Sequence, residues 1–214
     1  MTPKFLAEFL GTMFLVMVVL GSGIMAMDMF DGHAGLALLA NSIATGAGLF
    51  VLIQSLGSLS GAHINPIVTF VEVLWQRMPA KEGIIYVLAQ CLGACAGILL
   101  VHVMFRYPVF QISFVERAGW HLWISEFVAS FGLICVVALA GKKHVEFAPL
   151  AVAAYVTSAY WFTSSTGFMN PAVTLARTLT NTFGGMAPSY FLPFVVSQFT
   201  GAFVAWLVLK KLRS

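Results

Sequence analysis

The sequence predicts an all-α membrane protein, in which six transmembrane helices and two re-entrant half-helices form an inverted repeat. Composition is the first reason: the 214 residues are 60% hydrophobic and 9% charged, whereas a soluble domain carries about 25% charged residues. The second is a set of six apolar stretches that are long enough, or nearly so, to cross a bilayer. The third is a group of short motifs that recur in the same order in both halves of the chain. A chain this apolar is expected to have the lipid bilayer as its main partner.

The six expected spans are separated by shorter, more polar segments. They run roughly over 5–27, 35–56, 83–105, 122–140, 148–163 and 190–209. The first follows Lys4 directly and exceeds the apolar core of a signal peptide, so we expect a helix that is retained. Two further segments contain Asn65-Pro66 and Asn170-Pro171. They are too polar for ordinary spans and too apolar for ordinary loops.

The distribution of Lys and Arg predicts the orientation. Six crossings place both termini on one side of the membrane. Eight of the eleven basic residues fall on that side, namely Lys4, Arg77, Lys81, Lys142, Lys143, Lys210, Lys211 and Arg213. An excess of Lys and Arg marks the cytoplasmic face, so we expect a plasma (inner) membrane protein with both termini in the cytoplasm. The net charge of +3 then follows from topology, and no nucleic-acid partner is expected.

An internal repeat relates the two halves of the chain. Ala-Glu-Phe at 7–9 matches Ser-Glu-Phe at 125–127, Asn-Pro-Ile-Val-Thr at 65–69 matches Asn-Pro-Ala-Val-Thr at 170–174, and Ala-Gln at 89–90 matches Ser-Gln at 197–198. Each half holds three spans, so the copies have opposite orientations, as in transporters with inverted repeats. We therefore expect one transmembrane domain over 1–214, with repeats at about 1–107 and 118–214.

Each Asn-Pro pair predicts the start of a short helix. Proline suits the first turn of a helix, and the preceding asparagine is a strong N-cap. Helices over 66–76 and 171–181 would each be about 16 Å long, half a bilayer. The alternative is that each pair only marks a loop turn, but two copies in a repeat favour helix starts. Asn65 and Asn170 would then meet near the midplane.

Two helix N-termini at the midplane would act on a passing solute. Their partial positive charges would repel cations, including hydronium, and the asparagine amides would interrupt a proton wire. Non-helical backbone at this depth is tolerable only along a polar cavity. The residues expected to line it with carbonyl groups are Gly61, Ala62, His63, Ile64, Gly167, Phe168 and Met169.

The stretch Ser-Gly-Ala-His-Ile-Asn-Pro at 60–66 closely resembles the first signature of the aquaporin, or major intrinsic protein, family, with Ile67 where alanine is usual. Met-Asn-Pro-Ala at 169–172 resembles the second signature, which ends on Pro171 and Ala172. The likeness covers nearly the whole chain. It implies an hourglass bundle of six helices and two half-helices, one pore per subunit and a homotetramer.

One position departs from the family pattern. The residue after the second Asn-Pro-Ala is usually an arginine of the outer constriction, and here it is Val173. The resemblance places the other filter positions at Thr45, Gly167 and a residue of the fifth span. For that residue, alignment from 147–149 indicates Tyr160, whereas counting back from Asn170 indicates Ser158. We prefer Tyr160.

The resulting filter would be wider and less charged than a strict water filter. We expect a passive channel for small uncharged solutes: glycerol, metalloid hydroxides such as arsenous acid (arsenite), and/or water. A water-selective aquaporin and an ion-coupled secondary transporter are the alternatives. Arg177 lies one turn beyond Val173. It either supplies charge at the outer mouth or is an exposed side chain that extends to the interface.

Several polar residues inside the spans have two possible roles. Glu8 and Glu126 could form a proton relay, but their symmetric placement, and the resemblance, indicate that they accept hydrogen bonds from the re-entrant backbone. His63 would line the cytoplasmic vestibule or act as a pH gate. Cys91 and Cys95 share a helix face without further metal ligands beside them. No catalytic residue, cofactor or metal is expected, because the spans offer no clustered nucleophile, base or ligand set.

Overall fold

The computed structural model describes residues 2–140 and 145–213. Lys142 and Lys143, which the topology argument used, lie outside the described residues. The described part contains only helices and connecting segments. In chain order the helices are α1 (Pro3–Val16), η1 (Met17–Gly21), α2 (Ser22–Met29), α3 (Ala34–Ser60), α4 (Pro66–Leu74), α5 (Ala80–Met104), α6 (Trp120–Ala140), η2 (Val145–Phe147), α7 (Ala148–Phe162), α8 (Pro171–Thr178), η3 (Pro188–Tyr190) and α9 (Phe191–Arg213).

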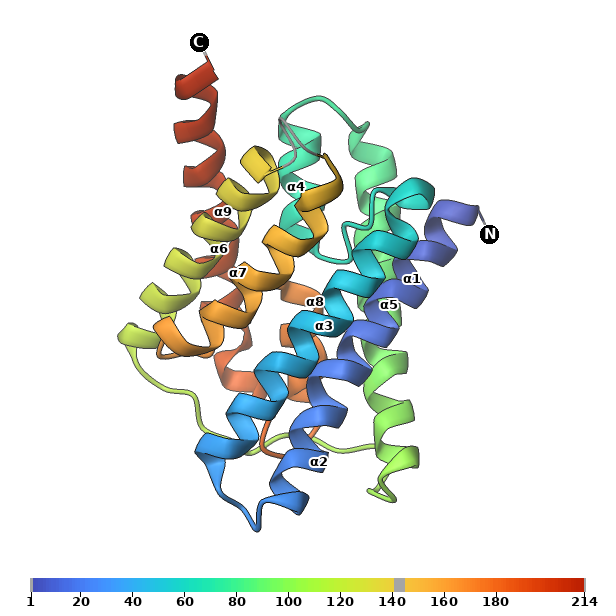
Figure 1. Ribbon diagram of the computed structural model, residues 1–214, viewed down its shortest axis with the longest axis vertical. Coiled ribbons are helices and arrows are strands. Elements are labelled where there is room, and N and C mark those ends of the chain that lie inside the picture. Colours follow the sequence, from blue (N-terminus) through green and yellow to red (C-terminus); the bar gives the residue numbers. More distant parts are fainter. Residues whose placement is uncertain (1, 141–144, 214) are drawn as a thin grey trace.

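The long helices form a bundle, and the short helices α4 and α8 lie within it (Figure 1). Five segments are long and apolar enough to cross a membrane: Pro3–Met29, Ala34–Ser60, Ala80–Met104, Trp120–Ala140 and Pro188–Leu212. The sixth expected span corresponds to α7, which has only 15 residues, or about 22 Å of helix. It packs along α3 and α6 as a member of the bundle. Both termini lie in the upper half of Figure 1.

Equivalent helices of the two repeats pack in equivalent ways. Helix α1 packs along α5, and α6 packs along α9. In both pairs a glycine permits a very close approach, because a Cβ atom at Gly93 would collide with the carbonyl oxygen of Phe9, and one at Gly201 with that of Phe127. Small residues at such crossings let helix backbones touch in membranes. The half-helices are shared between repeats, since α4 also packs on α9 and α8 on α5.

The first span contains a π-helical turn, η1. A π-turn leaves backbone carbonyls out of the regular α-helical ladder, and here the Asn41 side chain donates to the Val19 carbonyl oxygen at 2.6 Å and to the Ser22 hydroxyl at 2.9 Å. Leu15 and Val19, before and within this turn, both line the central cavity described below. The polar side chain of α3 thus compensates for the irregular turn beside the pathway.

Both half-helices are shorter than the sequence predicts. Helix α4 ends at Leu74 and α8 at Thr178, which corrects the expected ends at 76 and 181. In α4 the reason is local: Gln76 adopts a left-handed φ of 58°, which ends the helix. In α8 the last carbonyls have partners outside the helix, because Ser113 donates its N–H to the Thr178 carbonyl.

Candidate functional site

The N-termini of the two half-helices meet at the centre of the bundle. Each asparagine caps its own helix: the Asn65 Oδ1 atom accepts from the Ile67 N–H at 3.1 Å, and the Asn170 Oδ1 atom accepts from the Ala172 N–H at 3.0 Å. Pro66 and Pro171 occupy the first helical positions. The side chain of Asn170 also accepts from the Val173 N–H at 3.3 Å.

The same asparagines connect the two repeats. The Asn65 Nδ2 atom donates to the Met169 carbonyl at 2.8 Å, and the Asn170 Nδ2 atom donates to the Ile64 carbonyl at 2.9 Å. An amide nitrogen carries two hydrogens, so each asparagine keeps one N–H beyond this crosslink. Both asparagines line the central cavity, and that second N–H is the one available to a solute.

The segments that precede the asparagines have a strained backbone. Ala62, Ile64, Thr166 and Met169 have φ values of 47°, 40°, 65° and 48°. For residues other than glycine, the left-handed region costs on the order of 1–3 kcal/mol each and persists only when the surroundings impose it. The strain occurs at matching places in both repeats, so a matching restraint must hold each segment.

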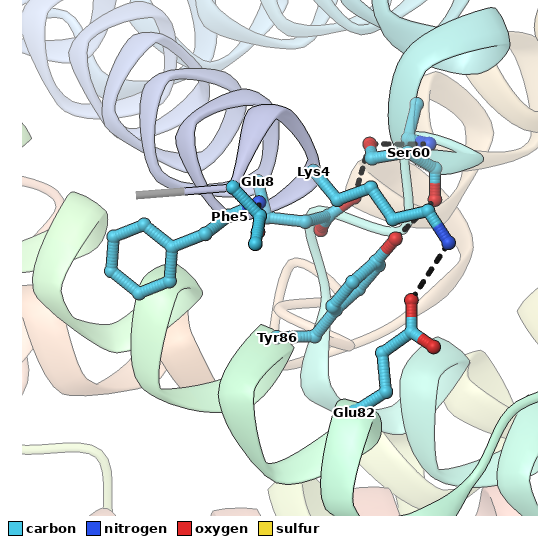
Figure 2. A network of polar contacts seen from close by, with 8 residues as sticks. Lys4, Phe5, Glu8, Ser60, Glu82 and Tyr86 are labelled. Atoms are coloured by element: carbon cyan, nitrogen blue, oxygen red, sulfur yellow. Dashed lines mark hydrogen bonds and ion pairs between the residues drawn. The ribbon is translucent and has the colours of Figure 1, made fainter.

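In the first repeat the restraint is Glu8. Its carboxylate accepts from the Ser60 hydroxyl at 2.7 Å, from the His63 N–H at 3.0 Å and from the Ile64 N–H at 2.7 Å. The Gln90 amide donates to it at 2.7 Å. Figure 2 shows Glu8 beside Ser60, whose carbonyl accepts from the Tyr86 hydroxyl at 2.9 Å.

In the second repeat Glu126 makes the corresponding contacts. Its carboxylate accepts from the Ser165 hydroxyl at 2.6 Å, from the Phe168 N–H at 2.8 Å and from the Met169 N–H at 2.9 Å. Gln198 donates to it at 2.7 Å. Both carboxylates are fully buried, neither lines the central cavity, and each accepts four hydrogen bonds. This arrangement fits a restraint on the backbone better than a proton relay.

Sequence reasoning missed one pair of residues in these networks. The Gln90 and Gln198 amides also donate to the hydroxyls of Thr69 and Thr174, at 3.0 Å and 2.9 Å. Each threonine lies in the first turns of its half-helix and so ties that helix to the glutamate. The signal was present in the repeat, since the threonine follows Asn-Pro at the same distance in both copies.

A central cavity of about 200 Å³ runs beside the meeting half-helices. It is lined by both asparagines, by all four expected filter residues and by the non-helical segments: Thr45, Gly61, Ala62, His63, Ile64, Asn65, Tyr160, Gly167, Phe168, Met169, Asn170 and Val173. Ile67, Pro66, Pro171 and Ala172 are buried and do not line it. The rest of the wall is largely aliphatic, with Leu49, Ile53, Val68, Val152 and Val156 among the residues.

Of the two candidates in the fifth span, Tyr160 lines the cavity and Ser158 does not. The Tyr160 hydroxyl lies 3.0 Å from the Thr45 hydroxyl, and both side chains face the cavity. Ser158 is exposed on the other side of α7 and donates to the Tyr155 carbonyl. Gly167 has a φ of 57° and lies close to Ala159, where a Cβ atom would approach to 2.9 Å. Thr45, Tyr160, Gly167 and Val173 therefore all line the same cavity.

Arg177 is buried, although the sequence left open that its side chain is exposed. It is 4% exposed and lines the central cavity beside Tyr160. Its Nη1 atom donates to the Gly184 carbonyl at 2.6 Å, and its guanidinium lies 3.9 Å from the centre of the Phe168 ring. The alternative of an Arg extending to the membrane interface is wrong, because the loop after α8 folds back over it.

His63 also lines the cavity. Its Nδ1 atom lies 3.0 Å from the Thr69 hydroxyl, and its ring packs against Tyr86 at 5.1 Å. Across residues 2–140 and 145–213, no three His, Cys, Asp or Glu side chains come together as a metal site would require. The wall of the cavity therefore mixes hydroxyl, amide and carbonyl groups with aliphatic side chains.

Comparison with known proteins places this geometry in a known context. Residues 1–163 match the family model described as "Major intrinsic protein". Aquaglyceroporin AqpS of Rhizobium meliloti (strain 1021) is 47% identical over 210 residues, which cover 98% of this chain and 90% of that protein. Aquaporin NIP2-3 of Zea mays is 34% identical over 208 residues, covering 94% and 68%. The X-ray structure of the aquaglyceroporin from Plasmodium falciparum shares the fold, with a TM-score of 0.74 at 20% identity over 96% of this chain and 93% of that one.

Proposed function

We propose that glycerol and metalloid hydroxides such as arsenous acid are among the solutes of this protein. The chain belongs to the major intrinsic protein family. It is therefore a passive multi-pass membrane channel for small solutes and not an enzyme. The observation that carries this proposal is the filter. The Thr45 and Tyr160 hydroxyls form one polar edge, and Val173 faces the same cavity without a donor or a charge. A solute with hydroxyl groups on one edge and an apolar opposite edge matches such a wall.

The meeting half-helices would exclude protons. Their N-termini carry partial positive charge, and the remaining N–H of Asn65 and of Asn170 would bind the oxygen of a passing water or hydroxyl. A water held by two donors cannot keep its neighbours in an unbroken chain of hydrogen bonds, and such donors and half-helix dipoles exclude protons in other pores. The carbonyls of Gly61, Ala62, His63, Gly167 and Phe168 would accept from the hydroxyl hydrogens of the solute.

Location and assembly are part of the proposal. The excess of Lys and Arg on the side of both termini supports a plasma (inner) membrane protein with cytoplasmic termini. Family membership supports a homotetramer with one pore in each subunit. A water-selective channel remains the second candidate, and an ion-coupled transporter is disfavoured because Glu8 and Glu126 are both fully engaged by the re-entrant segments.

The test is the flux of water, glycerol and arsenite into proteoliposomes by stopped-flow light scattering, for the wild type and for Val173→Arg. The substitution adds a long charged side chain to the filter. We expect glycerol and arsenite permeability to fall by about tenfold, which corresponds to a rise of ~1.4 kcal/mol in the barrier to permeation. The change in water permeability should be smaller. Unchanged glycerol and arsenite flux would show that Val173 does not shape the filter.

A further inference from the structure

Relatives usually have an arginine at the position of Val173. Here Arg177 supplies a guanidinium to the same cavity wall. It lines the same cavity as Thr45, Tyr160 and Val173, although it lies a full turn further along α8. Side chains of a helix lean toward its N-terminus. A long side chain at position 177 therefore reaches back over the turn that holds Val173, and the Tyr160 hydroxyl lies beside its guanidinium.

The guanidinium is held in place by its neighbours. Its Nη1 atom donates to the Gly184 carbonyl, and the Phe168 ring lies against it. The Nε atom is buried and has no hydrogen-bond partner within the described residues. What Arg177 offers to the cavity is therefore its charge, held at a fixed place in the wall.

No acid within the described residues forms an ion pair with this cation. The two ion pairs there join Lys4 to Glu82 and Arg77 to Glu72, away from the cavity. Glu126 is the acid whose charge reaches Arg177, but its oxygens are engaged by the re-entrant segment.

Arg117 adds a second positive charge on the same side. It donates to the Gly185 and Phe183 carbonyls, at 2.9 Å and 3.4 Å, and lines a smaller neighbouring cavity without reaching the central one. Burial and then the charge of Arg177 lower the pKa of this loop residue to about 10, which the charge of Glu126 opposes. Arg117 thus stays charged at neutral pH and adds to the positive charge around Arg177.

Comparison of the two repeats shows that a positive charge at this position occurs in the second repeat and not in the first. The position equivalent to Arg177, seven residues after the first-repeat asparagine, is Glu72. Glu72 forms an ion pair with Arg77 at 3.0 Å and does not line the cavity. The two halves match closely around Glu8 and Glu126, but only the α8 half exposes a cation to the pathway.

We propose that Arg177 is the charge-selecting residue of this pore, so that the channel rejects cations at the α8 side of the filter while neutral solutes pass. The inference rests on the proposed channel function. The Asn65 and Asn170 side chains already accept from the N–H groups at the helix N-termini, which reduces the fields of about half a charge there. Arg177 carries a whole positive charge, so its barrier to cations is larger than that of the helix N-termini.

Urea and guanidinium are suitable probes because they are nearly equal in size and shape and differ in charge. At an effective dielectric constant of ~20, a unit charge in the cavity wall is expected to change cation occupancy by on the order of tenfold or more. The experiment measures uptake of both, at millimolar concentration and fixed membrane potential, into proteoliposomes. Wild-type protein should take up urea and exclude guanidinium.

Two substitutions remove the barrier in different ways. Arg177→Gln removes the charge, and Val173→Glu keeps Arg177 but adds an opposite charge one turn away, which offsets it. Each should raise the guanidinium-to-urea permeability ratio by about tenfold or more, and Arg177→Lys should keep it within about threefold of the wild type.

Arg117→Gln is the matched control. Arg117 contacts the same loop and the same Phe168 ring as Arg177, but it lies outside the central cavity. Loss of its charge should change the guanidinium-to-urea permeability ratio by less than about threefold. The inference is overturned if the ratio stays constant in Val173→Glu or in an Arg177→Gln protein that conducts urea, if both solutes rise together, or if Arg117→Gln has the same effect. Absent urea and glycerol flux in the wild type would instead refute the channel function itself.

Discussion

At the scale of single residues, the proposed filter combines two hydroxyl groups with an uncharged residue at position 173. Thr45 and Tyr160 come from α3 and α7, and their hydroxyls lie 3.0 Å apart in the cavity wall. Each can both donate and accept, so together they can exchange hydrogen bonds with a polyol. Val173 contributes an apolar side chain to the same cavity. A wall that combines hydroxyl groups with an apolar side chain is expected to favour amphipathic solutes.

Removal of the Tyr160 hydroxyl tests this arrangement. In Tyr160→Phe a solute hydroxyl loses a partner, and one net hydrogen bond is worth about 0.5–1.5 kcal/mol. We expect glycerol permeability to fall by roughly threefold to tenfold relative to water in stopped-flow measurements. Ser158→Ala is the control, because Ser158 is exposed on the opposite side of α7. Equal effects of the two substitutions would contradict the assignment of Tyr160 to the filter.

At the scale of elements, the two re-entrant segments keep their strained shape because a buried carboxylate in another helix holds each one. Glu8 of α1 and Glu126 of α6 each accept two backbone N–H groups from the segment of their own repeat. The asparagines then join the two segments to each other. The cavity wall is consequently rigid, as a pathway needs if it is to select solutes by size.

Glu126→Ala should release the second segment. The Phe168 and Met169 N–H groups would lose their acceptor inside the protein, and each unsatisfied group costs about 1–3 kcal/mol. We expect a lower thermal unfolding temperature in detergent and a loss of glycerol flux. Glu116→Gln, at an exposed loop position, is the control and should leave both unchanged. A fully active Glu126→Ala protein would show that the carboxylate does not hold the segment.

The crossing of α6 and α9 gives a second prediction at this scale. A Cβ atom in Gly201→Ala would collide with the Phe127 carbonyl, and overpacking of this kind costs about 1–3 kcal/mol. We expect a lower unfolding temperature for Gly201→Ala. Gly57→Ala makes the same change in α3, where nothing lies within 4 Å of the new atom, so stability should stay level or rise slightly. The reverse order would argue against close contact between α6 and α9.

At the scale of the whole molecule, the inverted repeat places two half-helices with opposite directions end to end in one bundle. In Figure 1, α4 lies above α8 between the long helices. A cavity passes their junction, and Glu8 and Glu126 are engaged in holding the segments. Within the described residues no Asp or Glu lines this cavity, which fits passive flux.

Passive flux predicts independence from ion gradients. Glycerol entry into proteoliposomes should be the same with and without an imposed sodium or proton gradient, and its activation energy should be low. The measurement is stopped-flow light scattering over a range of temperatures. Acceleration by either gradient, or saturation at millimolar glycerol, would indicate the coupled transporter instead.

The sequence by itself determined the membrane class, the internal repeat of motifs, five long apolar spans and the helix starts at Asn65-Pro66 and Asn170-Pro171, because hydropathy, internal similarity and capping preferences are local properties. It could not determine where the half-helices end, since carbonyls at the end of α8 are bound by residues far along the chain, such as Ser113. It favoured Tyr160 over Ser158 but could not show that Tyr160 lines the cavity, nor could it place Arg177 in the cavity wall. Those outcomes depend on which helix faces meet and on a loop that folds back over α8. Only tertiary packing decides them, because they arise from contacts between residues distant in the chain.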